Sequence, residues 1–102
     1  MKVTFSDGTT IQENQVKDTY VKTIEYIGGD SVRSLGIMKN GSPLVAESLS
    51  EVPERYRSEV AANRIDGGFY VFAHMSTDAK ANVLKDISDR LGKPFIIEYV
   101  EQ

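Results

Sequence analysis

Residues 67–100 read GGFYVFAHMSTDAKANVLKDISDRLGKPFIIEYV, and this stretch decides the fold. After the double glycine, residues 69–75 are apolar on both faces, which is typical of a strand in the middle of a sheet. A serine–threonine pair then caps a helix at 77–91, which a glycine and a proline bring to an end. A second apolar strand follows at 95–100. The succession of strand, helix and strand predicts a domain of the α+β class.

The residues before this stretch predict a hairpin and a first long helix. The Asp-Gly pair at 7–8 joins two β-prone runs, 2–5 and 9–12, because glycine adopts the positive φ of a tight turn without steric cost. Apolar residues then recur every three or four positions as far as Ile27. This spacing predicts a helix that begins at Asn14, with Asn14 as its N-cap.

A second hairpin is predicted in the middle of the chain. The Asn-Gly pair at 40–41 joins a strand at 32–38 to a return strand at 43–46. The charged stretch 47–66 is predicted to be a long loop. A short helical turn is expected inside 55–62, because a compact domain rarely holds so long a segment without structure.

Together these elements predict one α+β domain over residues 1–102, with the order β-β-α-β-β-loop-β-α-β. We expect a mixed or antiparallel sheet of about five to six strands with two helices on one face. The other face of that sheet would then be open to partners.

The composition is that of a folded globular protein, and it excludes several classes. Of the 102 residues, 40% are hydrophobic and 26% charged, and the net charge is −3. The chain has no cysteine, which excludes disulfides and cysteine nucleophiles. The acidic balance argues against generic electrostatic binding to nucleic acids. Neither a signal peptide nor a membrane span is visible in the sequence, so we expect a cytoplasmic protein.

The first candidate site is an anion-binding site at the start of the second long helix. Backbone N–H groups and the helix dipole favour an anion at such a place. Ser76, Thr77 and Lys80 add donors, and His74 is the one histidine of the chain. A structural interpretation competes with this one, in which Ser76 or Thr77 only caps the helix and Lys80 is solvated.

The second candidate site is a group of arginines with an interleaved tyrosine. Arginine and tyrosine together can hold phosphates and stack on bases, which would suit a nucleic acid. Glutamates lie between these residues along the chain, so a solvated loop of mixed charge is the competing interpretation. The residues concerned are Arg33, Arg55, Tyr56, Arg57 and Arg64.

No catalytic residue, cofactor or metal site is predicted. One histidine and no cysteine leave no paired metal ligands. Ser76 lacks the flanking glycines of a nucleophile elbow. Neither double glycine belongs to a phosphate-binding or dinucleotide-binding motif. A minor enzyme with His74 as general base stays open as an alternative.

The last two predicted strands carry more large apolar side chains than one sheet face needs to cover two helices. Tyr70, Phe72, Ile96 and Tyr99 are therefore predicted to form an interaction face, open to a protein partner or to a second copy. The competing interpretation is that aromatic pairs stabilise an otherwise ordinary sheet.

Short motifs spread over most of the chain resemble a family of small uncharacterised bacterial domains, which also occur at the C-termini of longer bacterial proteins. The resemblance implies an accessory or recognition role and assigns no catalytic residue. The motifs are Phe5-x-Asp7-Gly8-Thr9-x-Ile11, Asp18-Thr19-Tyr20, Ser34-Leu35-Gly36-Ile37, Gly68-Phe69-Tyr70-Val71 and Ser76-Thr77-x-x-Lys80.

The sequence therefore favours a non-catalytic interaction module that recognises a protein partner or itself. A module for nucleic acids or phosphate ligands is the second hypothesis, and an enzyme is the third.

Overall fold

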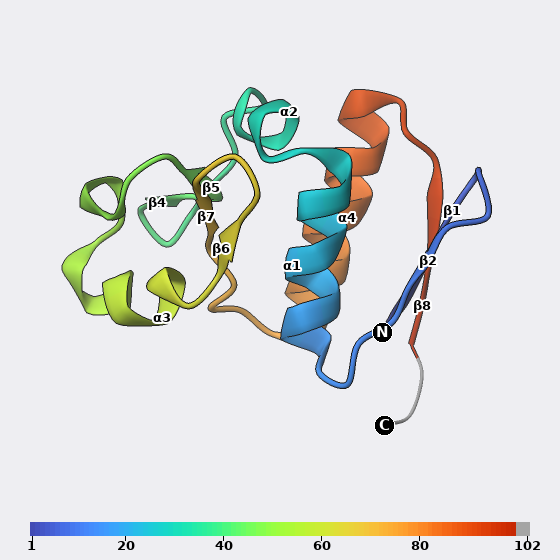
Figure 1. Cartoon of the computed structure of the whole chain (residues 1–102), viewed down its shortest axis with the longest axis horizontal. Coiled ribbons are helices and arrows are strands. Elements are labelled where there is room, and N and C mark those ends of the chain that lie inside the picture. Colours follow the sequence, from blue (N-terminus) through green and yellow to red (C-terminus); the bar gives the residue numbers. More distant parts are fainter. Residues whose placement is uncertain (100–102) are drawn as a thin grey trace.

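The computed structural model describes residues 1–99, and two long helices lie at its centre (Figure 1). Helices α1 (Val16–Ile27) and α4 (Thr77–Leu91) run side by side. One sheet lies on one side of them, on the right in Figure 1, and a lobe of short elements lies on the other. The chain is thus of the α+β class, as predicted, with a layer of helices between two small sheets.

The sheet on the right is antiparallel, with the strand order β2-β1-β8. Its strands are β1 (Lys2–Phe5), β2 (Thr10–Ile11) and β8 (Phe95–Glu98). The predicted hairpin forms, since the N–H of Phe5 donates to the carbonyl of Thr9 at 2.8 Å and the turn glycine has a φ of 90°. Among the described residues β8 pairs with β1 alone, so β8 is an edge strand.

Both long helices bury apolar stripes with the predicted spacing. Their large buried apolar side chains are Tyr20, Ile24, Ile27, Val83, Leu84 and Ile87. Helix α4 begins and ends as predicted. The hydroxyl of Ser76 accepts the N–H of Ala79 at 3.1 Å, and Gly92 closes the helix in the left-handed conformation.

The start of α1 differs from the prediction. Gln15, and not Asn14, occupies the N-cap position, and its side chain makes no capping hydrogen bond. The hydroxyl of Thr19, inside the helix, instead accepts the N–H of Glu13 at 2.9 Å. This hydrogen bond ties the segment before the helix to the first turn of α1.

The lobe on the left begins with a short helix, α2 (Gly29–Arg33), and a hairpin of β3 (Met38–Lys39) and β4 (Ser42–Pro43). The turn between these strands has positive φ at both central residues, 50° at Asn40 and 79° at Gly41. This is the type I′ turn that Asn-Gly favours, so the predicted hairpin is confirmed, although its strands are shorter than expected.

The remaining elements of the lobe surround a second three-stranded sheet, with the order β5-β7-β6. Strand β7 is in the middle of this sheet, as its doubly apolar sequence predicts, although the strand expected at 69–75 ends at Val71. The predicted helical turn inside 55–62 is α3. The bounds are β5 (Val45–Ala46), η1 (Leu49–Glu51), η2 (Glu54–Tyr56), α3 (Arg57–Ala61), β6 (Arg64–Ile65) and β7 (Phe69–Val71).

The prediction of one sheet of five to six strands is wrong, because the strands are divided among three small antiparallel sheets. Of the strand expected at 32–38 only Met38 is in a strand, because residues 32–33 belong to α2 and a turn follows at 34–36. Helix α2 packs so closely on β7 that a Cβ at Gly29 would lie 2.6 Å from the ring of Phe69. The strand expected at 95–100 ends at Glu98, and Val100 lies outside the described residues.

The hydrophobic core runs through the helix layer and joins both sheets. One cluster of buried side chains includes Val3 of the first sheet, Ile24 and Leu84 of the helices, and Val71 of the second sheet. The hydroxyl of Tyr20 crosses the same boundary and donates to the carbonyl of Phe72 at 3.1 Å. The two sheets therefore share one core instead of forming separate units.

Candidate functional site

The start of α4, the predicted anion site, already has internal partners for its polar groups. The hydroxyl of Ser76 is the helix cap, and its carbonyl accepts the N–H of Lys80 at 3.0 Å. Thr77 is the first residue of the helix. Of the two interpretations of this turn, the structure supports the structural one for Ser76.

Lys80 is buried and turned toward the backbone. Only 8% of the residue is exposed, and its ammonium donates to the carbonyl of Met75 at 2.6 Å. Burial lowers the pKa of Lys80; the nearby Glu59 opposes this shift and Lys17 adds to it. Lys80 therefore fixes the segment between β7 and α4, and the competing expectation that it is solvated is wrong.

His74 lies beyond the end of β7 and forms an exposed pair with Glu59. Its Nδ1 is 3.1 Å from a carboxylate oxygen of Glu59, and its ring lies 5.2 Å from the ring of Tyr56. A carboxylate that orients an imidazole is one half of an acid–base arrangement. Glu59, on α3, was not expected beside His74, since nothing in the sequence relates two residues in separate elements.

Arg33 is held in an ion-pair network inside the left lobe. Its guanidinium donates to Glu51 at 2.7 and 3.2 Å and to the carbonyl of Val45 at 2.9 Å, and Glu47 lies 3.4 Å from its Nε. The hydrogen bond between Arg33 and Glu51 raises the pKa of Arg33 and lowers the pKa of Glu51. Arg33 thus ties α2 to the segment that follows β5.

The other members of the predicted basic cluster do not join Arg33. Arg57 donates to the carbonyl of Val52 at 2.8 Å, and the guanidinium of Arg55 lies over the ring of Tyr56 at 4.7 Å. Arg64 is exposed on β6. The structure brings Arg55, Tyr56 and Arg57 together but gives Arg33 and Arg57 internal roles.

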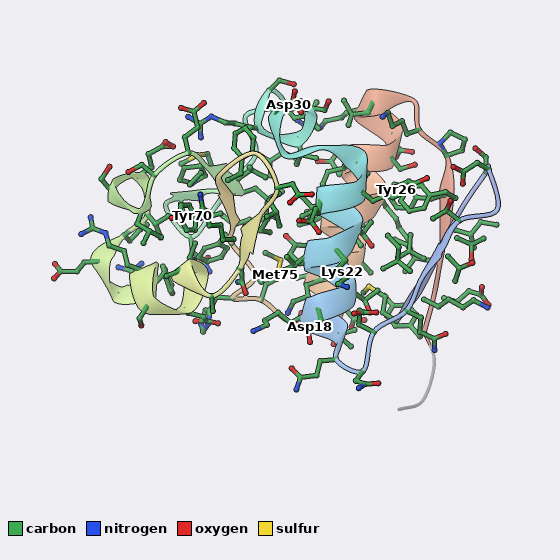
Figure 2. The ribbon with its side chains drawn as sticks, viewed as in Figure 1. Asp18, Lys22, Tyr26, Asp30, Tyr70 and Met75 are labelled. Carbon is green, nitrogen blue, oxygen red and sulfur yellow. The ribbon has the colours of Figure 1, made fainter. Side chains whose placement is uncertain are left out.

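The predicted interaction face is divided between the two ends of the molecule. Phe72 is fully buried in a small cluster of the left lobe, and Tyr70 packs against that cluster. Ile96 and Tyr99 are 66% and 57% exposed at the other end. The four residues therefore do not form one face, because their strands belong to different sheets with the helices between them (Figure 2).

We call the open edge of β8, with the exposed side chain of Ile96 on the strand and that of Tyr99 just beyond its end, the β8 surface. Ile96 points away from the helices, and Phe95 and Ile97, on the opposite face of the strand, pack against the main core. Partial burial and the neighbouring carboxylate of Asp78 raise the pKa of Tyr99. The phenol of Tyr99 is thus placed near the start of α4, and Ile96 is left as an apolar side chain in solvent.

A cavity of about 520 Å³ lies at the end of the same sheet and was not foreseen. The hydroxyl of Tyr26 donates to Asp7 at 2.7 Å, and the ring of Tyr26 stacks on Phe5 at 4.6 Å. The N–H of Thr9, followed by the hydroxyl of Tyr26, lowers the pKa of Asp7. Figure 2 shows Tyr26 on the side of α1 that faces this sheet. The sequence holds no signal for the pairing, since it joins a turn to a residue outside the helix stripe.

Within residues 1–99 no group of three or more acidic or histidine side chains is arranged to hold a metal ion. In the same range no helix combines the length and apolar character needed to cross a membrane. A scan of the chain against protein-family models finds no matching family, and searches among curated proteins and solved structures find no significant match. The resemblance to a family of bacterial domains therefore stays a prediction.

Proposed function

We propose that this chain is a small non-catalytic interaction module that binds another protein chain, its own copies included, through the β8 surface. The observation that carries the proposal is the exposure of Ile96 on an edge strand, with the exposed Tyr99 just beyond the end of that strand. An unpaired strand edge offers backbone donors and acceptors to another chain. Apolar side chains beside that edge add a gain in burial when a partner covers them.

The two alternative functions have less support. A site for nucleic acids or phosphate needs free cations, whereas Arg33, Arg57 and Lys80 donate to acceptors of the protein itself. An enzyme based on the His74–Glu59 pair needs a cavity beside it, and four of the best-formed cavities among residues 1–99 are lined by other residues.

The test is a dilution series of the isotopically labelled protein by NMR, from millimolar to micromolar concentration. We expect concentration-dependent shifts of the amide signals of β8 and Tyr99, because association buries these residues. Ile96→Lys should abolish the shifts by placing a charge in the contact. Met38→Lys is the matched control, since Met38 is 58% exposed but lies in the other lobe.

Recognition of the chain's own copies through the β8 surface is excluded if the β8 signals do not change over this concentration range. It is also excluded if Met38→Lys removes the shifts as completely as Ile96→Lys does, because the contact would then not depend on the β8 surface.

A further inference from the structure

The backbone groups of β8 point alternately toward β1 and toward the open edge. The N–H of Phe5 donates to the carbonyl of Thr9, directly before β2, so the backbone groups of Phe5 point to the β2 side of β1. Because the direction alternates along a strand, those of Thr4 and Lys2 point to β8, where their partners are Ile96 and Glu98. The N–H and C=O groups of Phe95 and Ile97 therefore point to the open edge.

We propose that two copies of this chain pair along β8 in antiparallel fashion, with a twofold axis beside Ile96. This inference rests on the proposed function and names the second copy as the partner. In this register Phe95 of each copy is opposite Ile97 of the other, so both outward-pointing residues of each strand find hydrogen-bond partners within the strand. The two β2-β1-β8 sheets then become one continuous sheet.

The side chains favour this register. Ile96 faces its own counterpart at a non-hydrogen-bonded position, where cross-strand side chains are closest. Both residues, exposed in the single chain, then contact each other.

Other registers that use the same edge are less well matched. An axis beside Glu98 places two carboxylates opposite each other, which is repulsive. An axis beside Ile97 places Ile96 opposite Glu98 and needs backbone groups of Tyr99, which lies beyond the end of β8. A register that uses residues before Phe95 is blocked, since the N–H of Lys93 already donates to the carbonyl of Ser88 at 3.1 Å.

The size of the contact sets the expected strength. Stable dimers usually bury roughly 1,200–2,000 Å² in total, and two four-residue strands bury less than this. We therefore expect a weak dimer that is populated at high protein concentration.

Disulfide trapping with single cysteines tests the register. The chain has no cysteine of its own, so each variant reports on one position. Opposed residues at a non-hydrogen-bonded position have Cα atoms about 4.5 Å apart, and a disulfide tolerates this distance. We expect Ile96→Cys to form covalent dimers under mild oxidation about tenfold faster than the controls, since association raises the effective thiol concentration.

Two controls and one mixture separate the outcomes. In the proposed register two cysteines at position 98 lie about 13 Å apart, so Glu98→Cys should dimerise as slowly as Met38→Cys in the other lobe. Equal rates for all three variants overturn the pairing. Preferential bonding between Ile96→Cys and Glu98→Cys chains in a mixture moves the axis to Ile97 and also overturns it.

The NMR dilution series distinguishes this failure from failure of the proposed function. Dilution shifts on β8 without a fast Ile96→Cys dimer leave the interaction module standing and remove only the twofold pairing. Absence of both removes self-association through the β8 surface and, with it, the twofold pairing.

Discussion

Tyr20 shows how one residue connects the two sides of the molecule. Its ring is fully buried in α1, and burial raises the pKa of its phenol, which therefore stays protonated. The proton is used in the hydrogen bond to the carbonyl of Phe72, across 52 positions of sequence. A polar group in such surroundings is costly unless it is paired, so the bond fixes where the left lobe meets the helix.

We expect Tyr20→Phe to lower the free energy of unfolding by about 1–3 kcal/mol, because the Phe72 carbonyl loses a buried donor. Urea denaturation followed by circular dichroism measures the change. Tyr26→Phe also removes a tyrosine hydroxyl, but one at an exposed position, and should lower the free energy of unfolding by about 0.5 kcal/mol or less. Equal losses in the two variants would contradict the role given to the buried bond.

At the scale of elements, the start of α4 decides between two neighbouring hydroxyls that the sequence leaves equivalent. The Ser76 hydroxyl accepts the N–H of Ala79, whereas Thr77 is already helical. We expect Ser76→Ala to lower the free energy of unfolding by about 1 kcal/mol through loss of the cap.

Thr77→Ala is the matched control and should change stability by no more than about 0.5 kcal/mol. Thermal unfolding of both variants measures the difference. A larger loss for Thr77→Ala would show that Thr77, and not Ser76, supplies the cap.

The elements show which part of a fold can be predicted from sequence. The turns at 7–8 and 40–41 and the stripes of both long helices depend on residues close together in the chain, and they were predicted correctly. The partition of the strands into three sheets was not predicted. The alternation of apolar and polar residues tells which side of a strand is buried but not which strand lies beside it. For the same reason Phe72 was expected on a surface and lies in a core.

The candidate site residues likewise divide into those that the sequence indicates and those that only the tertiary fold brings together. Exposure of Ile96 and Tyr99 follows from excess apolar residues in the last strand, which the sequence displays. The His74–Glu59 pair and the Tyr26–Asp7 bond join residues that only the tertiary fold brings together.

At the scale of the whole molecule, the shared core makes the two lobes one cooperative unit. Val3, Ile24, Leu84 and Val71 belong to a single cluster that extends through the helix layer. We expect one thermal unfolding transition, with the same midpoint by far-ultraviolet circular dichroism and by tyrosine fluorescence. Two separated transitions would show that the left lobe unfolds on its own.

The pairing of β1 with β8 also has a consequence for the time order of biosynthesis. Lys2 is opposite Glu98, and Phe5 is opposite Phe95, so β1 finds this long partner only when residues 95–98 have been made. Contacts so distant in sequence form late. Until then the edge of β1 that pairs with β8 stays open, and an open strand edge is a target for chaperones.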